Sequence, residues 1–251
     1  RRDGGEAVVE AIRNLGIKNI IMSPGSEWSP VWEALTRDRF ENVSSPDYLQ
    51  IWHENLAINI ATGYTFMTGK PQAVLLHAGV GPLQGIMGMH AAMQSEVPML
   101  VLAGESVSLG ADPNLKVEAQ WYGGVSPGGI DKLVSNSVKW SNTVPSSPTL
   151  YRSIIRAGEM AQRGPKGPVF LDIPLEYMLE DWTPDRELCD VPPPSQTQAV
   201  AAEIEALIDD IEAAKNPMII TEFAGRIPGA FKALIRFAET ASILKLKEDR
   251  V

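Results

Sequence analysis

Short apolar runs separated by amphipathic stretches constrain the fold of this chain more than any other feature. The apolar runs are too short for helices and lie near Gly or Pro, as buried strands do. They cover residues 17–22, 73–76, 99–103, 169–173 and 218–220. Helix-like patterns cover residues 6–15, 30–35, 56–67, 83–94 and 149–163. This alternation predicts an α/β fold, a parallel sheet with helices on both faces.

Several predicted strands run into turns that contain Gly or Pro. These turns are residues 23–26, 77–82 and 104–106. Ligands of open parallel sheets bind outside the carboxyl ends of the strands. The turns are therefore the first place to look for chemistry.

Composition excludes several classes of function. The net charge of −9 argues against general nucleic-acid binding, because an acidic protein repels phosphate backbones. No apolar run is long enough to span a membrane. The single cysteine excludes an intrachain disulfide and a Cys-based zinc site, and low cysteine use fits a cytoplasmic protein.

The chain divides into a large domain and the start of another. Residues 183–198 are rich in proline and lack periodicity, as an extended linker would. We therefore expect one domain over residues 1–182. Residues 199–251 contain a helix pattern, a strand and a second helix pattern, which predicts the beginning of a second α/β domain.

Two residues near the predicted strand ends have functional and structural interpretations. Glu54 precedes a long helix pattern, where a carboxylate also serves as a cap or dipole partner. His77 stands before the turn Gly79-Val80-Gly81, although a lone strand-end histidine is often structural. The three histidines form no HxH or HxxxH pair, so no metal cluster is expected. Gln84 replaces the third glycine of a dinucleotide motif, which weakens that alternative.

Residues 3 to about 180 contain a series of motifs in a fixed order. They are Ser23-Pro24-Gly25, His53-Glu54, Gly63-Tyr64, Thr68-Gly69-Lys70-Pro71, Val97-Pro98-Met99-Leu100-Val101 and Gly167-Pro168-Val169-Phe170-Leu171-Asp172-Ile173-Pro174. In this order the chain resembles the pyrimidine-binding domain of the thiamine-diphosphate enzymes related to acetolactate synthase and benzoylformate decarboxylase. The segment after the linker is similar to the start of that superfamily's middle domain.

The resemblance implies an enzyme that cleaves or forms a carbon–carbon bond next to the carbonyl of a small 2-oxo acid. It implies that Glu54 activates the cofactor and that His77 and Ser26 act on the substrate. Within this superfamily, Ser26 and His77 favour a benzoylformate-decarboxylase-like enzyme. An acetolactate-synthase-like carboligase and a non-catalytic or split-enzyme subunit stay as alternatives. The cofactor-binding residues implied are Ser23, Pro24, Gly25, Glu54, Gly79, Gly81 and Gln84.

The same resemblance implies thiamine diphosphate as cofactor, with Mg²⁺ held by a second domain. The Gly-Asp-Gly signature of that domain does not occur in this sequence, which suggests either a fragment or one subunit of a split enzyme. We also expect a homo-oligomer, a dimer or tetramer with the cofactor between subunits.

Two predicted helices and one segment bear on the partner and the substrate. The helices at residues 56–67 and 83–94 carry no Asp, Glu, Lys or Arg, so we expect them to pack against a partner subunit, with Met87, Met89 and Met93 filling irregular gaps. Burial inside this one domain is the alternative. Residues 116–124 match neither relative well and are expected to shape the substrate pocket.

Overall fold

The computed structural model describes residues 2–108, 129–184, 197–241 and 244–245. The chain forms two compact units, Arg1–Ser195 and Gln196–Val251. Their division falls inside the predicted linker, residues 183–198. Most of that linker, and all of the expected pocket segment 116–124, lie outside the described residues, so both stay predictions.

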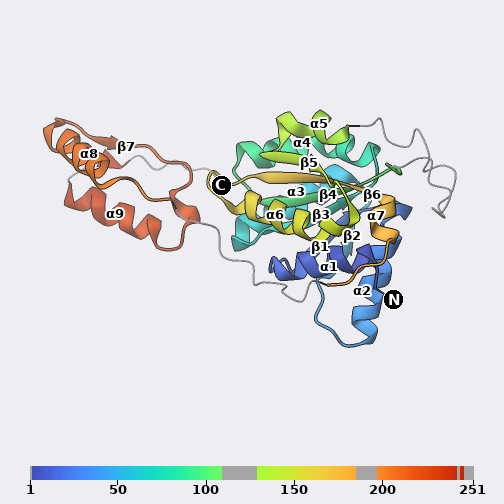
Figure 1. Cartoon of the computed structure of the whole chain (residues 1–251). Helices are drawn as coiled ribbons and strands as arrows, with labels where there is room; N and C mark the ends of the chain where they lie inside the picture. The colour runs from blue at the N-terminus through green and yellow to red at the C-terminus, as the bar shows by residue number, and fades with distance from the viewer. Residues whose placement is uncertain (1, 109–128, 185–196, 242–243, 246–251) are drawn as a thin grey trace. The chain divides into compact units, whose positions relative to one another are not determined.

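The first unit contains a parallel sheet of six strands in the order β2-β1-β3-β4-β6-β5 (Figure 1). The strands are β1 (Asn19–Ser23), β2 (Asp47–Gln50), β3 (Gln72–Leu76), β4 (Met99–Glu105), β5 (Trp140–Thr143) and β6 (Pro168–Pro174). Since neighbouring strands are all parallel, their carboxyl ends share one edge of the sheet.

Helices cover both faces of this sheet. They are α1 (Gly4–Asn14), α2 (Ser29–Phe40), α3 (Glu54–Thr68), α4 (Val80–Gln94), α5 (Ile130–Val134), α6 (Leu150–Gln162) and α7 (Leu175–Leu179). Short 3₁₀ turns are η1 (Ser26–Trp28), η3 (Ser135–Ser137) and η4 (Ser147–Thr149). In Figure 1, α4 and α5 lie on one side of the sheet, and α1 and α2 lie on the other.

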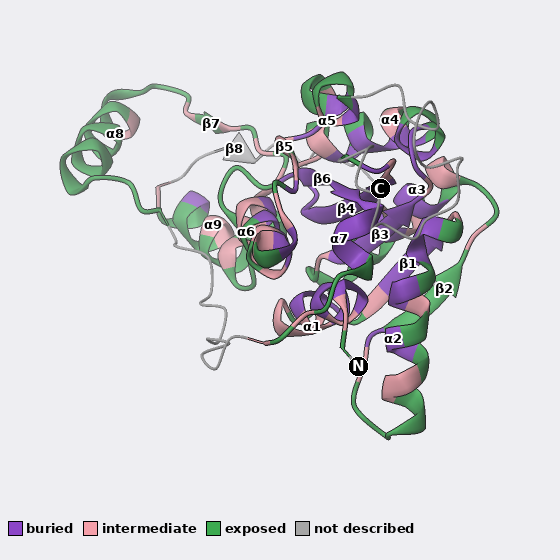
Figure 2. Ribbon diagram, turned by 45° about the vertical axis from the view of Figure 1, so that its right-hand side comes forward, coloured by how far each residue is buried: buried purple, intermediate pink, exposed green. Residues whose placement is uncertain are grey.

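Successive strand side chains alternate between two buried clusters, one on each face. Leu100 and Leu102 of β4 pack with α1, α2, α6 and α7. Val101 and Ala103 of the same strand pack with α3, α4 and α5. Both faces are therefore apolar, which explains the continuous hydrophobic runs in the sequence and confirms the predicted fold class (Figure 2).

The two edge strands, β2 and β5, were not predicted from the sequence. All four residues of β2 are exposed, and none of the β5 residues is fully buried. An edge strand in this position needs no apolar run, so it lacks the signal that revealed the central strands. Helix α2 continues to Phe40, five residues beyond the predicted end at residue 35. These last five residues are exposed or partly exposed.

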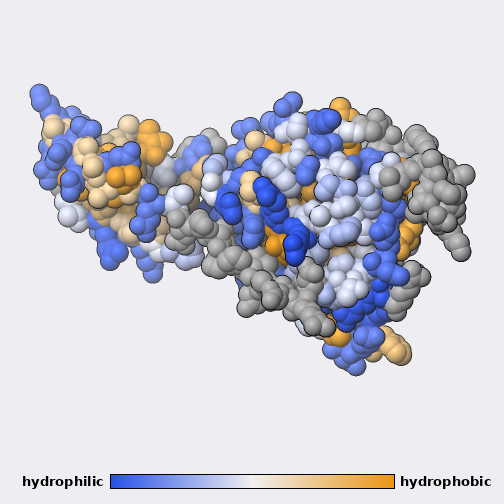
Figure 3. All heavy atoms as spheres, in the orientation of Figure 1, coloured by the Kyte–Doolittle hydropathy of each residue, from blue (hydrophilic) through white to orange (hydrophobic). Residues whose placement is uncertain are grey.

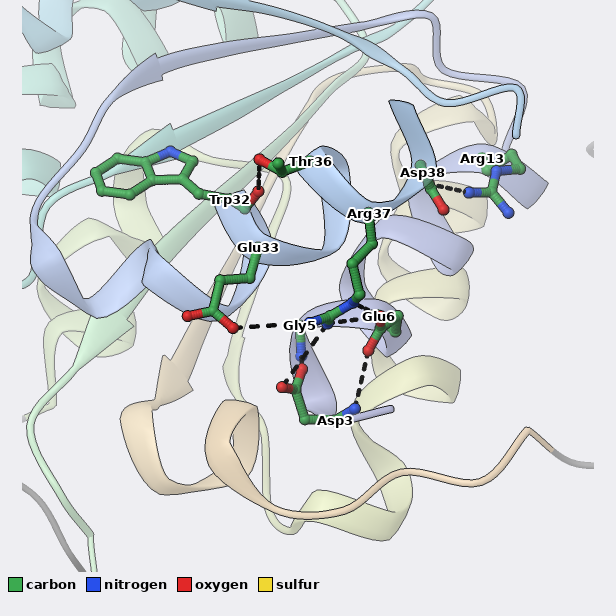
Figure 4. Close-up of polar contacts among 9 residues, drawn as sticks. All are labelled: Asp3, Gly5, Glu6, Arg13, Trp32, Glu33, Thr36, Arg37 and Asp38. Atoms are coloured by element: carbon green, nitrogen blue, oxygen red, sulfur yellow. Dashed lines mark hydrogen bonds and ion pairs between the residues drawn. The ribbon is translucent and has the colours of Figure 1, made fainter. Parts of the chain in front are cut away.

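Ion pairs join the outer sides of α1 and α2 (Figure 4). Arg37 of α2 lies 2.6 Å from the carboxylate of Glu6, and Arg13 of α1 pairs with Asp38. Asp3 caps α1 by accepting a hydrogen bond from the Gly5 N–H at 2.9 Å. These contacts fix α2, and with it the η1 turn that precedes it.

The second unit contains α8 (Ala201–Ala213), β7 (Met218–Ile219), η5 (Ala224–Arg226), α9 (Ala230–Thr240) and β8 (Leu244–Lys245). These elements agree with the predicted helix–strand–helix order. Several of its large apolar side chains are exposed, for example Leu207, Ile220 and Phe231. Figure 3 shows hydrophobic patches on this unit among hydrophilic residues. None of the described helices is long and apolar enough to cross a membrane.

Candidate active site

The carboxyl ends of β1 and β3 bring together residues that are distant in sequence. Ser23, the last residue of β1, pairs in register with Leu76, the last residue of β3. The η1 turn follows β1, and His77 follows β3. Two of the predicted strand-end turns therefore meet at the same point of the sheet edge.

A histidine–glutamate pair occupies this meeting point. His77 Nδ1 lies 2.9 and 3.0 Å from the two carboxylate oxygens of Glu27, and the Ala78 N–H donates to Glu27 Oε1 at 2.9 Å. The Glu27 side chain is fully buried, whereas that of His77 is 37% exposed. His77 is therefore not a core histidine bonded only to a backbone carbonyl, because one side of its ring is reachable from outside.

The pKa of His77 is raised above its ordinary value of 6.5. The hydrogen bond to Glu27 is the main cause, and the negative charges of Glu27 and Glu54 add to it. Partial burial acts in the opposite direction, because it disfavours the imidazolium. The protonated form of this imidazole is thus more favoured than that of a free histidine, which suits a proton donor.

Two glycines make room for the pair. A Cβ atom on Gly25 would lie 1.9 Å from His77 Nδ1, and one on Gly104 would lie 2.2 Å from Glu27 Cγ. Neither position can carry a side chain without displacing the pair. This explains the glycines at the ends of β1 and β4, while the cofactor-binding role of Gly25 stays a prediction.

Glu27 was missed in the sequence. It stands one position after Ser26, immediately beyond the strand-end turn 23–26 that the sequence singled out. An acidic residue directly after such a turn, with a histidine directly after another predicted strand, was the available signal. What the sequence lacks is the register that makes β1 and β3 neighbours.

Glu54 begins α3, with His53 as the N-cap residue. The His53 Nδ1 atom accepts a hydrogen bond from the Asn55 N–H at 3.2 Å. The carboxylate of Glu54 is half-buried and makes no hydrogen bond or ion pair within the part of the chain that the structure describes. It lies near enough to His77 for its charge to act on the imidazole. The structure therefore places Glu54 and His77 in one neighbourhood.

Ser26 lies in η1, next to Glu27. Its side chain is exposed, and its carbonyl accepts a hydrogen bond from the Ser29 hydroxyl at 2.6 Å. Among the described residues, the Ser26 hydroxyl forms no hydrogen bond with His77 or Glu27. The chain thus brings Ser26 to the predicted turn without tying its side chain to the pair.

The other predicted cofactor residues gather around the start of α4. Gly79 has a left-handed φ of 62° and caps this helix, and a Cβ on Gly81 would lie 2.9 Å from the Leu76 side chain. Ser23 and both glycines are buried, whereas Gln84 is exposed one turn into the helix. Glycine is therefore required by the backbone here, and a contact with a cofactor stays a prediction.

The residues present fit the pyrimidine half of the implied cofactor better than its diphosphate half. Glu54 offers a half-buried carboxylate without a partner in the described chain, and such a group suits a ring nitrogen. No cluster of three or more His, Cys, Asp or Glu within the described ranges could hold a metal ion. The larger surface hollow, about 450 Å³, lies along Trp32 and Arg37 on α2, and His77 does not line it.

A second group of buried acids lies at the ends of β4 and β6. Asp172 is 1% exposed, and burial together with the nearby carboxylates of Glu105 and Asp131 raises its pKa to about 9. Its Oδ1 atom has no hydrogen-bond partner among the residues that the structure describes. Nearby, the fully buried Glu176 accepts hydrogen bonds from the backbone N–H and hydroxyl of Ser108. No motif in the sequence links Asp172 with Glu105 and Asp131, because these residues are far from it along the chain.

Comparisons with known proteins relate the chain to a family of thiamine pyrophosphate enzymes. Residues 2–118 match the family described as "Thiamine pyrophosphate enzyme, N-terminal TPP binding domain". The acetolactate synthase large subunit of Haemophilus influenzae is 28% identical over 173 residues, which cover 68% of this chain and 27% of that protein. The benzoylformate decarboxylase of Pseudomonas aeruginosa is 28% identical over 176 residues, which cover 70% of this chain and 30% of that protein.

A solved structure shows the same fold. The thiamine diphosphate-dependent 4-hydroxybenzoylformate decarboxylase of Rhodococcus jostii RHA1 superimposes with a TM-score of 0.81 at 22% identity. The match covers 97% of this chain and 44% of that chain. The chain thus spans less than half of the relatives that it matches. From the matched family and the two kinds of relative, we conclude that the matched part of the chain, residues 2–118, belongs to the superfamily of thiamine-diphosphate-dependent enzymes.

Proposed function

We propose that this chain supplies the pyrimidine-binding half of an active site that cleaves or forms a carbon–carbon bond next to the carbonyl of a 2-oxo acid. The observation that carries the proposal is the partly exposed His77, paired with the buried Glu27 at the strand ends and close to Glu54. The names of the curated relatives support the same class of reaction.

Thiamine diphosphate, when bound, supplies the nucleophilic carbon and the electron sink for this chemistry. Glu54 holds a proton at a pyrimidine ring nitrogen, a role that suits a half-buried carboxylate at a helix N-terminus. The surface around the pyrimidine ring is formed by Ser23, Pro24, Gly25, Gly79, Gly81 and Gln84. The diphosphate of the cofactor and Mg²⁺ are assigned to a second domain, because the described residues offer no metal site.

His77 moves a proton at the reacting carbon or the carbonyl oxygen. Since Glu27 accepts a hydrogen bond from Nδ1, Nε2 is the ring atom left for the substrate. The Ser26 hydroxyl is free to donate to the substrate carboxylate. These roles favour a benzoylformate-decarboxylase-like reaction. The acetolactate synthase relatives keep a carboligase as the second candidate.

The exposed face of α3 and α4 supports a homo-oligomer. Leu56 and Met67 of α3 are 50% and 87% exposed, and Leu83 and Met87 of α4 are 45% and 69% exposed. Neither helix carries Asp, Glu, Lys or Arg on this face beyond Glu54. Met89 is fully buried against the sheet, so the prediction that it contributes to the partner surface is wrong. We propose a dimer or tetramer that covers the remaining apolar side chains.

The function is tested by assaying the full-length protein with thiamine diphosphate, Mg²⁺ and a panel of 2-oxo acids, following both carbon dioxide release and carboligation. We expect Glu54→Gln to lower both activities by at least about 10²-fold, since the amide cannot hold the proton. Glu33→Gln, on the exposed side of α2, is the matched control. Near-normal turnover in Glu54→Gln would remove the central claim.

His77→Ala separates the two candidates. In a decarboxylase-like enzyme this substitution should slow the protonation and product-release steps, while the cofactor still binds. If decarboxylation of every tested 2-oxo acid is unchanged, the synthase-like alternative replaces it.

A further inference from the structure

The peptide group that precedes His77 is held at both ends. Its carbonyl, that of Leu76, accepts a hydrogen bond from the indole N–H of Trp28 at 2.8 Å, in a fully buried position. Its N–H, that of His77, donates to the Ser23 carbonyl at 3.1 Å. The end of β3 is thus tied to both β1 and η1.

The peptide group that follows His77 is held in the same way. Its carbonyl accepts a hydrogen bond from the Gly81 N–H at 3.1 Å, and its N–H, that of Ala78, donates to Glu27 Oε1 at 2.9 Å. Together these bonds satisfy every backbone polar group on either side of the imidazole. A buried peptide group with both partners has little freedom to rotate.

Two of these bonds come from adjacent residues of one short turn. The side chains of Glu27 and Trp28 in η1 form hydrogen bonds with the backbone on either side of His77, at Ala78 and at Leu76. Trp28 is 0% exposed and packs in the buried cluster between the sheet and α1, α2 and α6. Its indole therefore ties the η1 turn, and the Glu27 carboxylate with it, to the rigid core.

We propose that Trp28 is a positioning residue for His77, which holds the strand end and the η1 turn in register so that the imidazole keeps its place at the site. The catalytic role of His77 in this inference rests on the proposed function, whereas the hydrogen bonds that position it do not. Two of the four bonds involve a side chain, and the indole bond is the one that does not use the carboxylate partner of His77.

The test is Trp28→Phe in the 251-residue chain, which keeps an aromatic ring and removes the N–H. NMR titration of the histidine ring resonances, without cofactor or substrate, measures the pKa of His77. We expect that pKa to fall towards the ordinary value of 6.5, because a loosened η1 turn weakens the bond to Glu27. The charged groups that act on this imidazole, Glu27 and Glu54, are unchanged in the variant.

Trp32→Phe is the matched control. Trp32 lies four residues further on, in α2, and is half-buried. Within the described ranges its indole N–H has no hydrogen-bond partner (Figure 4). Its replacement should leave the pKa of His77 unchanged. Val31→Ala, which removes buried side-chain volume from the same cluster, controls for loss of stability alone. An equal pKa change in Val31→Ala and Trp28→Phe would overturn the positioning role.

A measurement on the unmodified chain covers the case in which Trp28→Phe does not fold. The indole proton of Trp28 should exchange with solvent much more slowly than that of Trp32, and equal rates would overturn the inference. The activity assay separates the two proposals. If the pKa of His77 falls in Trp28→Phe but no 2-oxo acid is consumed by the unmodified protein, the positioning role stands and the proposed function falls. If the protein is active and the pKa is unchanged, the positioning role alone falls.

Discussion

Two neighbouring parts of one sheet edge bury carboxylates in opposite surroundings. At the ends of β1 and β3, Glu27 receives hydrogen bonds from the His77 imidazole and the Ala78 N–H. At the ends of β4 and β6, Asp172 is surrounded by the carboxylates of Glu105 and Asp131 and leaves one oxygen without a partner. Both side chains are almost completely buried.

The difference shows that burial alone does not decide the charge of a strand-end acid. Donors around Glu27 stabilise a negative charge and, through it, the imidazolium of His77. Around Asp172 only Thr143 offers a hydrogen bond that favours the charged form, and burial and like charges outweigh it. The β1–β3 end is therefore built to hold a charge pair, while the β4–β6 end holds a proton.

The largest effect is expected for Asp172→Asn. The pKa of Asp172 is about 9 in the folded chain and 3.8 as a reference, so the folded state keeps a proton that the unfolded state loses as the pH rises. Stability should then fall between about pH 4 and pH 9, by at most about 1.4 kcal/mol per pH unit. The amide removes this dependence, so its gain in melting temperature over the unmodified chain should grow from pH 5 to pH 8.

Glu105→Gln is the companion variant for this test, because it relieves the like charge without removing Asp172. It should give a gain in the same direction but a smaller one, since burial is the first cause of the raised pKa. A constant difference across the pH range for Asp172→Asn would contradict the protonated Asp172.

Glu27→Gln tests the charge pair at the other end. The amide oxygen can still accept from the Ala78 N–H, but the charge that raises the pKa of His77 is lost. That pKa should fall, and activity at neutral pH should drop by about 10²-fold if His77 is the proton donor. Assays at several pH values with NMR titration of His77 check both effects.

The raised pKa of His77 also determines how the stability of the fold changes with pH. A raised histidine pKa stabilises the fold below pH 6.5, and that stabilisation disappears as the pH rises through the folded-state pKa. In Glu27→Gln this dependence should be much weaker, because only the charge of Glu54 still raises the pKa of His77. An unaltered pH profile of the melting temperature would mean that the pair is not charged.

The smallest effect is expected for Gly104→Ala. Gly104 lies in β4, next to β3, and its replacement tests whether β4 holds Glu27 in place. The added methyl group would lie 2.2 Å from Glu27 Cγ, so the buried carboxylate has to move. Overpacking of this kind costs about 1–3 kcal/mol. Calorimetry should show the loss of stability, and the pKa of His77 should fall as its partner shifts.

Gly63→Ala on α3 is the matched control for that substitution, because a Cβ there meets nothing within 4 Å. It should leave the pKa of His77 unchanged and stabilise the helix slightly. If Gly104→Ala behaves in the same way, Glu27 is not held against β4 as the structure indicates.

The sequence by itself determined the central sheet and the region of the site. Its apolar runs marked β1, β3, β4 and β6, because strands buried on both faces need continuous hydrophobic side chains. Its Gly- and Pro-bearing turns marked where these strands end, and its ordered motifs identified the superfamily.

Only the tertiary structure decided which side chains meet at the sheet edge. The exposed edge strands β2 and β5 carried no apolar signal, and their order depends on packing between distant segments. Glu27 and His77 became partners through the register of β1 with β3, and Asp172 met Glu105 through that of β6 with β4. Pairing between strands is a non-local property, since hydrogen bonds that set it join residues far apart in the chain. For this reason the sequence located the strand-end chemistry, and the fold alone showed how its charges are paired.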